Sequence, residues 1–227
     1  MDEVSVIQLF LQRVSILAIP VLFAITVHEA AHGWVAYRLG DSTAMMLGRV
    51  TFNPLKHIDP VGTVLVPLAT LLMTGFLFGW AKPVPVDWRN LHNQRRDMGL
   101  VALAGPGANL IMALFWGILI KFGLALAPVS EWFAMPLIAM GAAGVFINCI
   151  LMVLNLTPIP PLDGGRVLAA LLPPKLALAF SRLEPYGLFI VLGLLVTGVL
   201  GRLLWPVVWA LIDLLPGSQI VAQFFNR

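Results

Sequence analysis

Long apolar runs are the feature that most limits what this chain can fold into. They cover residues 6–39, 61–80, 98–120, 132–156 and 186–215. A helix needs about 20 such residues to cross a bilayer, and its backbone polar groups must bond within the segment. Only 11% of the residues are charged, against about a quarter in soluble domains. We therefore predict an all-α polytopic membrane protein with about five to six transmembrane helices.

The chain is expected to form one integral membrane domain over residues 1–227, with no room for an appended soluble domain. Its motifs lie in residues 6–172, and apolar helices follow in 186–215. Proline and glycine inside the 61–80 run indicate a broken or re-entrant segment. The connection KPVPV, Lys82–Val86, carries prolines that suit an exposed edge strand. Short re-entrant or β-hairpin connections are therefore expected between the helices.

The formal net charge is +3, and most Lys and Arg residues lie between the apolar runs. Such placement favours contact with the lipid bilayer and its anionic headgroups, and no nucleic-acid partner is predicted. Excess positive charge places the 82–96 connection in the cytoplasm. The 41–60 connection shares that side only if the run between them is re-entrant. The single cysteine, Cys149, is interpreted as a packing residue.

The stretch VHEAAHGWVAYRLGD, residues 27–41, places three ionisable side chains inside an apolar run. His28 and His32 are four residues apart, so on a helix both imidazoles project from one face and reach one ion. Glu29 is offset around the helix and can act on a metal-bound water. This HExxH spacing is typical of zinc proteases, and ionisable groups within a span are usually functional. The alternative is a polar cluster that packs helices together.

A hydrolytic zinc site usually has a third protein ligand. His57 and His92 lie in polar connections and are interpreted as surface histidines. Asp163 is the stronger candidate, because it follows the proline-broken stretch NLTPIPPLDGG, residues 155–165. Irregular backbone at membrane depth is tolerated where it lines a cavity or is buried in protein. The alternative is that Asp163 only caps the short helix after it.

Three blocks make the chain resemble the site-2 proteases, a family of intramembrane zinc metalloproteases. HEAAH is similar to the family's HExxH, AGPGANL at 104–110 to its GPxxN block, and NLTPIPPLDGG to its third-ligand block. The resemblance covers about residues 6–172 and is to compact bacterial members without a PDZ or CBS domain. It implies a multi-pass protein of the bacterial cytoplasmic (inner) membrane.

The resemblance also implies a role for each matching residue. His28, His32 and Asp163 would bind one Zn²⁺ per chain, and Glu29 would be the catalytic general base. Asn155 would support the substrate carbonyl or its oxyanion, unless its amide instead ties up broken backbone. The GPxxN block would be structural: Gly105 and Gly107 permit close helix approach, Pro106 lies between them, and Asn109 bonds across helices.

The function implied is hydrolysis of peptide bonds within or near transmembrane segments, and the expected partner is a single-span membrane protein or a remnant peptide. An edge strand would bind the unwound substrate by β-augmentation. Two alternatives remain at this point. One is a zinc- or proton-coupled transporter, which usually shows repeated halves that we do not find here. The other is an inactive relative that acts as a binding protein.

Overall fold

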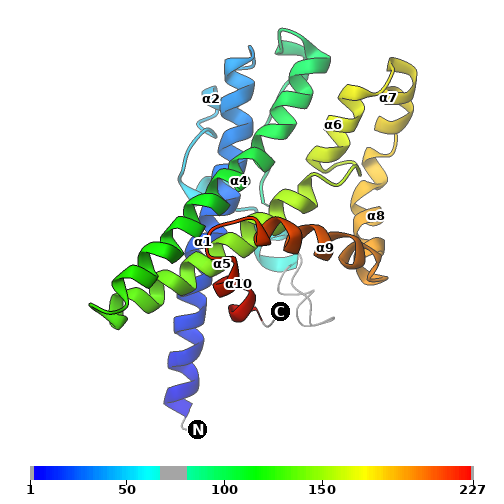
Figure 1. Cartoon of the computed structure of the whole chain (residues 1–227). Helices are drawn as coiled ribbons and strands as arrows, with labels where there is room; N and C mark the ends of the chain where they lie inside the picture. The colour runs from blue at the N-terminus through cyan, green and yellow to red at the C-terminus, as the bar shows by residue number, and fades with distance from the viewer. Residues whose placement is uncertain (1–2, 67–80, 226–227) are drawn as a thin grey trace.

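A computed structural model describes residues 3–66 and 81–225 of the chain. Those residues form α-helices (Figure 1) joined by turns, by the 3₁₀ segments η1 and η3 and by the π-helical segment η2. The elements are α1 (Glu3–Arg38), α2 (Thr43–Met46), η1 (Pro54–Lys56), η2 (Pro60–Leu65), η3 (Trp88–Asn90), α4 (Gln94–Leu126), α5 (Glu131–Asn155), α6 (Asp163–Leu171), α7 (Pro174–Ser181), α8 (Glu184–Val196), α9 (Val199–Asp213) and α10 (Ser218–Phe224). The prediction of an all-α membrane protein is confirmed.

Three helices are long and apolar enough to cross a membrane: Ile16–Arg38 within α1, then α4 and α5. The bent pair α7 and α8, whose axes differ by 65°, makes a fourth if it is counted as one broken span. The described residues thus hold three or four spans rather than five to six. The apolar region 186–215 is two helices of 13 and 15 residues, which is short of the ~20 that a span needs. They separate at Gly198, whose φ is +73°. Most of the expected run 61–80 lies outside the described residues.

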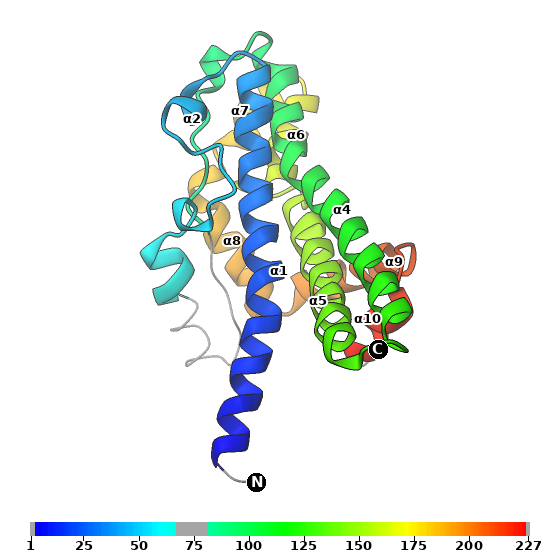
Figure 2. The same cartoon turned by 90° about the vertical axis from the view of Figure 1, so that its left-hand side faces the viewer.

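Helices α1, α4 and α5 lie side by side and form the centre of the molecule (Figure 2). The core between α4, α5 and α9 is formed by buried side chains such as Trp116, Val145 and Ile212. Small residues allow this close packing: a Cβ on Gly144 would lie 2.2 Å from Cγ of Trp116. Cys149 is buried in this core, as its interpretation as a packing residue expected.

The 41–60 and 81–93 connections lie against each other at one end of α1. The Lys82 N–H donates to the His57 carbonyl at 2.9 Å, and the His92 N–H donates to the Leu39 carbonyl at 3.0 Å. The two connections therefore share a side of the membrane. The interpretation of His57 as a surface histidine is wrong, because its side chain is buried and its Nε2 lies 3.1 Å from the Thr51 carbonyl oxygen.

The expected β-hairpin or edge strand is absent from the residues that the structure describes. Residues 81–87 are extended, but their backbone groups bond to side chains and to one isolated carbonyl rather than to a neighbouring strand. Pro83 and Pro85 have no N–H to offer to a ladder, and Arg49 binds the Lys82 and Pro83 carbonyls. The segment is therefore held against α1 as a single extended strap.

Asp41, just after the end of α1, binds the 81–93 connection through its carboxylate and should make the protein's stability depend on pH. It is fully buried and accepts hydrogen bonds from Thr43, the Asp87 N–H and the Asn90 amide. Burial raises the pKa of the Asp41 carboxyl, but these hydrogen bonds outweigh it and leave the pKa below its ordinary value. A depressed folded-state pKa stabilises the protein above the unfolded-state pKa of about 3.9, and that stability is lost as the pH falls through the folded-state value.

We expect Asp41→Asn to lower the free energy of unfolding at pH 7 by about 1–3 kcal/mol, because the amide accepts fewer of these hydrogen bonds. The loss should be smaller at pH 3. Thermal melts in detergent at both pH values measure it. Equal losses at the two pH values would contradict the assignment of acid sensitivity to Asp41.

Candidate active site

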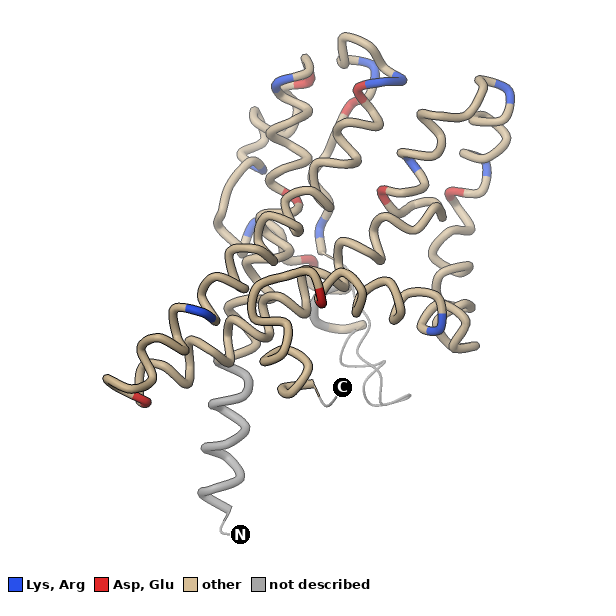
Figure 3. The backbone as a smooth tube through the Cα atoms, in the orientation of Figure 1, with Lys and Arg blue, Asp and Glu red and all other residues tan. Residues whose placement is uncertain are grey.

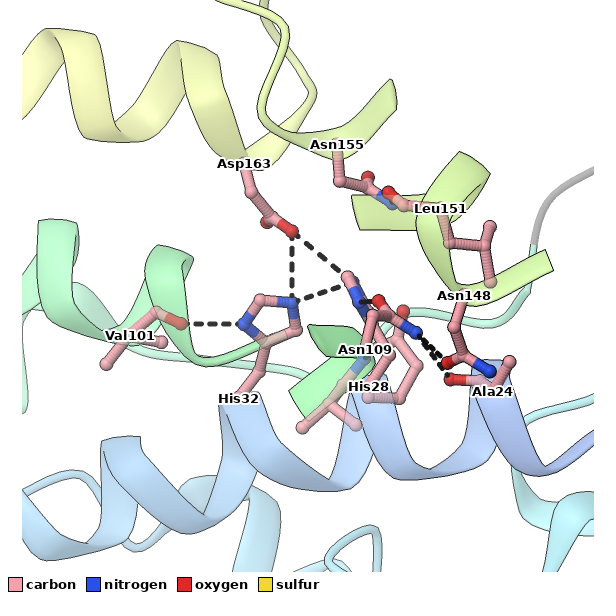
Figure 4. A network of polar contacts seen from close by, with 11 residues as sticks. Ala24, His28, His32, Val101, Asn109, Asn148, Leu151, Asn155 and Asp163 are labelled. Atoms are coloured by element: carbon pink, nitrogen blue, oxygen red, sulfur yellow. Dashed lines mark hydrogen bonds and ion pairs between the residues drawn. The ribbon is translucent and has the colours of Figure 1, made fainter. Parts of the chain in front are cut away.

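Two imidazoles on α1 face the centre of the helix bundle. His28 and His32 are one turn apart and are both buried, with their Nε2 atoms 3.1 Å from each other. Figure 4 shows the two rings turned toward a carboxylate that arrives from α6. The i, i+4 spacing on one helix face is what brings the two Nε2 atoms to one point.

Asp163 supplies that carboxylate as the first residue of α6. Its Oδ2 atom lies 3.3 Å from Nε2 of His28 and 3.3 Å from Nε2 of His32. The chain reaches this point through the irregular turn 156–162. Gly164 and Gly165, which follow the turn, pack so closely on its backbone that a Cβ on either would collide with it. The structure thus brings the three predicted ligands together from elements 131 residues apart in sequence.

These three atoms have the separations that a zinc ion requires. Zinc–ligand bonds of about 2.0–2.1 Å in a tetrahedral site place the ligand atoms about 3.3–3.4 Å apart. The observed separations are 3.1, 3.3 and 3.3 Å. Oδ2 of Asp163 is buried and has no hydrogen-bond partner among the described atoms. A buried carboxylate oxygen without such a partner is costly unless a cation binds it, so the residues fit this metal.

The far side of each imidazole ring is held by an acceptor. Nδ1 of His28 lies 2.6 Å from Oδ1 of Asn109, and Nδ1 of His32 lies 2.7 Å from the Val101 carbonyl oxygen. Because both partners are acceptors, each Nδ1 carries the proton and each Nε2 presents its lone pair to the site. Such outer contacts fix the tautomer and the ring orientation of metal-binding histidines.

Asn109 belongs to a chain of buried amides that crosses three helices. Its Nδ2 donates to Oδ1 of Asn148 at 2.8 Å and to the Ala24 carbonyl at 3.3 Å. The Asn148 amide in turn donates to the Gly144 carbonyl at 2.8 Å. Asn109 bonds across helices, as expected, but its partner Asn148 was not predicted. An amide in the middle of the apolar helix α5 was the signal, since polar groups within a span need partners.

We expect Asn109→Ala to weaken zinc binding by about 10- to 100-fold, the usual effect of removing an outer partner of a histidine ligand. Asn155→Ala is the matched control, because the Asn155 amide donates to the Leu151 carbonyl of its own helix at 2.9 Å. Zinc affinity is measured by competition with a chelator. Equal affinities in the two variants would contradict a role for Asn109 in orienting His28.

Asn155 was predicted either to support the oxyanion or to tie up broken backbone. Its side chain points along α5 toward Leu151 rather than toward the two imidazoles (Figure 4). This contact agrees with a role of the Asn155 amide in bonding to the helix backbone. The oxyanion role remains a prediction.

Gly105 lies directly against the two imidazoles. A Cβ at this position would be 2.4 Å from Nε2 of His32 and 2.6 Å from Nε2 of His28. The close helix approach predicted for the glycines of this block therefore applies to Gly105, where helix α4 faces the predicted ligands. Gly107 has open space where its Cβ would be, so the prediction is wrong for that residue. Pro106 is buried inside α4.

Glu29 follows His28 on α1 and is half-buried. Its Oε2 atom accepts a hydrogen bond from the Val84 N–H at 2.7 Å, so the carboxylate is fixed beside the strap 81–87. His57 and His92 do not join the cluster that His28, His32 and Asp163 form within the described residues. The arrangement is two imidazoles and a carboxylate around one point, with the Glu29 carboxylate on the same helix as the imidazoles.

Comparison with known proteins gives consistent matches. The sequence pattern of Peptidase family M50 matches residues 16–197. Two relatives carry the name "Putative zinc metalloprotease". YwhC of Bacillus subtilis (strain 168) is 38% identical over 198 residues, which cover 84% of each chain. Rip2 of Mycolicibacterium smegmatis is 32% identical over 196 residues, which cover 85% of this chain and 71% of that protein. No solved structure gives a significant match.

Proposed function

Because this chain belongs to Peptidase family M50, the site-2 proteases, and is thus a membrane metalloprotease, we propose that it cleaves peptide bonds within or near transmembrane segments. The substrates would be single-span membrane proteins or remnant peptides. The observation that carries this proposal is the position of the three ligand atoms, which are 3.1–3.3 Å apart on buried elements of the helix bundle.

One zinc ion per chain would be held by His28, His32 and Asp163. When bound, zinc polarises the scissile carbonyl and makes a water molecule more acidic. Glu29 would accept a proton from the attacking water on its carboxylate and later give a proton to the leaving amine. Asn109 and the Val101 carbonyl hold the two imidazoles in the orientation that this chemistry needs.

A substrate helix protects its amides with its own hydrogen bonds, so it must unwind before a water can attack. The proposal is therefore tested with two substrates that share one cleavage sequence. One carries it in a single membrane span in proteoliposomes, and the other carries it in a soluble protein. We expect the span to be cleaved and a zinc chelator to stop the reaction. Preferential cleavage of the soluble substrate would contradict the intramembrane assignment.

The distribution of charge supports an orientation in the bacterial cytoplasmic membrane. Figure 3 shows Lys and Arg gathered at the end of the molecule where α1 ends and α4 begins. Arg38 ends α1, Arg89 lies in η3, and Arg95 and Arg96 are in the first turn of α4. Cytoplasmic connections carry an excess of Lys and Arg, so this end would face the cytoplasm. His32 lies six residues before Arg38, so the site is about 9 Å inside that end at 1.5 Å per residue.

We expect Val129→Cys, in the connection between α4 and α5, to react with a membrane-impermeant maleimide on spheroplasts. Arg89→Cys should react only after the membrane is opened. Both positions are highly exposed, and the native Cys149 is buried. Labelling of Arg89→Cys on closed spheroplasts would show that the protein has the opposite orientation in the membrane.

A further inference from the structure

The strap 81–87 contains the tripeptide Pro83-Val84-Pro85. Proline has no N–H, so Val84 provides the one backbone donor in these three residues. A residue that precedes proline is restricted to extended conformations. The tripeptide therefore presents a single N–H group with little freedom to turn away.

Two residues of the 41–60 connection fix this strap. Arg49 is a buried arginine whose Nη2 donates to the Lys82 carbonyl at 2.9 Å and to the Pro83 carbonyl at 3.2 Å. The His57 carbonyl accepts the Lys82 N–H at 2.9 Å. Hydrogen bonds from a charged guanidinium are stronger than neutral ones. The Lys82 N–H and the Lys82 and Pro83 carbonyls are thus all bonded to the 41–60 connection.

The Val84 N–H held in this way meets the catalytic carboxylate. It donates to Oε2 of Glu29 at 2.7 Å, across 55 residues of sequence. Val84 is only 8% exposed. A short hydrogen bond from a buried N–H to a carboxylate fixes the carboxylate's rotamer. The hydrogen bond therefore fixes the position of the Glu29 carboxylate through its Oε2 atom.

We propose that Val84 and Arg49 are positioning residues for Glu29: the Val84 N–H orients the carboxylate, and Arg49 holds the strap that carries this N–H. This inference rests on the proposed function of Glu29 as the general base. The strap has two alternative roles, either stabilising the fold only or binding substrate as an edge strand. Each alternative gives a different result in the tests below.

The first test measures the contact itself and does not depend on activity. Metal-free protein labelled with ¹⁵N-valine reports amide exchange at Val84, with Val145 in the buried core as a reference. We expect Glu29→Ala and Arg49→Met each to speed exchange at Val84 by about 10-fold or more and to leave Val145 unchanged. Exchange at Val84 that does not respond to Glu29→Ala would overturn the inference, whether or not the protein is a protease.

The second test separates kcat from KM in proteoliposomes with a single-span substrate. Val84→Pro removes the N–H, and we expect kcat to fall by about 10- to 100-fold, as for a misplaced catalytic group, with KM and zinc content unchanged. Val84→Ala keeps the N–H and should restore at least ten times the kcat of Val84→Pro. Arg49→Met should act like Val84→Pro, and Arg49→Lys should retain more activity than Arg49→Met.

A rise in KM at constant kcat would show that the strap binds substrate and would overturn the positioning role. Equal losses in Val84→Pro and Val84→Ala, with a matching fall in melting temperature, would show a purely structural role. Arg49→Met keeps the inference testable if Val84→Pro does not fold. Absence of cleavage by wild-type protein that holds zinc would instead refute the proposed function, while the exchange test on Val84 still stands.

Discussion

Gly105→Ala is expected to abolish zinc binding, with a loss of affinity on the order of 100-fold or more. The added Cβ would lie 2.4 Å from Nε2 of His32 and 2.5 Å from Cε1 of His28, closer than real Cβ contacts come. Neither ring can turn aside without giving up its hydrogen bond to Asn109 or to the Val101 carbonyl. The measurement is zinc content after equilibration at a buffered free zinc concentration.

Gly107→Ala is the matched control for this prediction. It adds the same methyl group to the same helix two residues away, where nothing lies within 4 Å of the new atom. Both variants replace a helical glycine with the better helix former, so helix propensity changes equally. Gly107→Ala should bind zinc like the wild type. Equal zinc content in the two variants would contradict the placement of Gly105 beside the imidazoles.

Asp163→Asn is expected to weaken zinc binding by about 10-fold or more, and Asp163→Ala by about 100-fold or more, because they remove the negative charge or the whole ligand. Asparagine and aspartate are equally good helix N-caps, so a capping role predicts almost no change for Asp163→Asn. The structure places Asp163 inside α6, with Leu162 at the cap position. Chelator competition gives the affinities.

Stability provides the second half of this test. The Oδ2 atom of Asp163 is buried without a hydrogen-bond partner among the described atoms. Removing it should cost the metal-free protein little or no thermal stability. A large fall in the melting temperature of metal-free Asp163→Asn, with zinc affinity intact, would show that the carboxylate is structural.

The two histidines and the glutamate were predictable because their chemistry is local. His28, Glu29 and His32 lie within one and a half turns of one helix, so the residue spacing alone determines which face each occupies. The position of Asp163 near the histidines was predictable for a different reason, since prolines and glycines mark irregular backbone, which at membrane depth is tolerated where it lines a cavity or is buried in protein. In both cases the sequence carries the signal within about ten residues.

The contacts that orient these groups were not predictable in the same way. Asn148 lies 39 residues from its partner Asn109, and the Val84 N–H lies 55 residues from Glu29. No short-range pattern encodes such pairs, because they depend on how α1, α4, α5 and the strap pack together. Within the described residues the expected edge strand at 82–86 is an extended strap instead, because β-branched residues near prolines are also compatible with an extended segment that bonds to side chains.

The described residues hold fewer continuous spans than their apolar runs suggest, because composition does not reveal where an apolar run breaks. Residues 186–215 are apolar throughout, yet the chain turns at Gly198 in a left-handed conformation. Pro206, in the same run, lies inside α9 and does not end it. A glycine can take a positive φ at low cost, so it ends a helix where the sequence still reads as apolar.

Zinc content and cleavage of a single-span substrate, measured together for wild-type protein and Glu29→Gln, test the central claim most directly. Glu29 is beside the three ligand atoms but is not one of them, so Glu29→Gln should hold as much zinc as the wild type. It should lose cleavage by about 100-fold or more, since the amide cannot accept the proton. Wild-type protein without zinc, or cleavage by Glu29→Gln at the wild-type rate, would contradict the account and favour a packing or transport role for these residues.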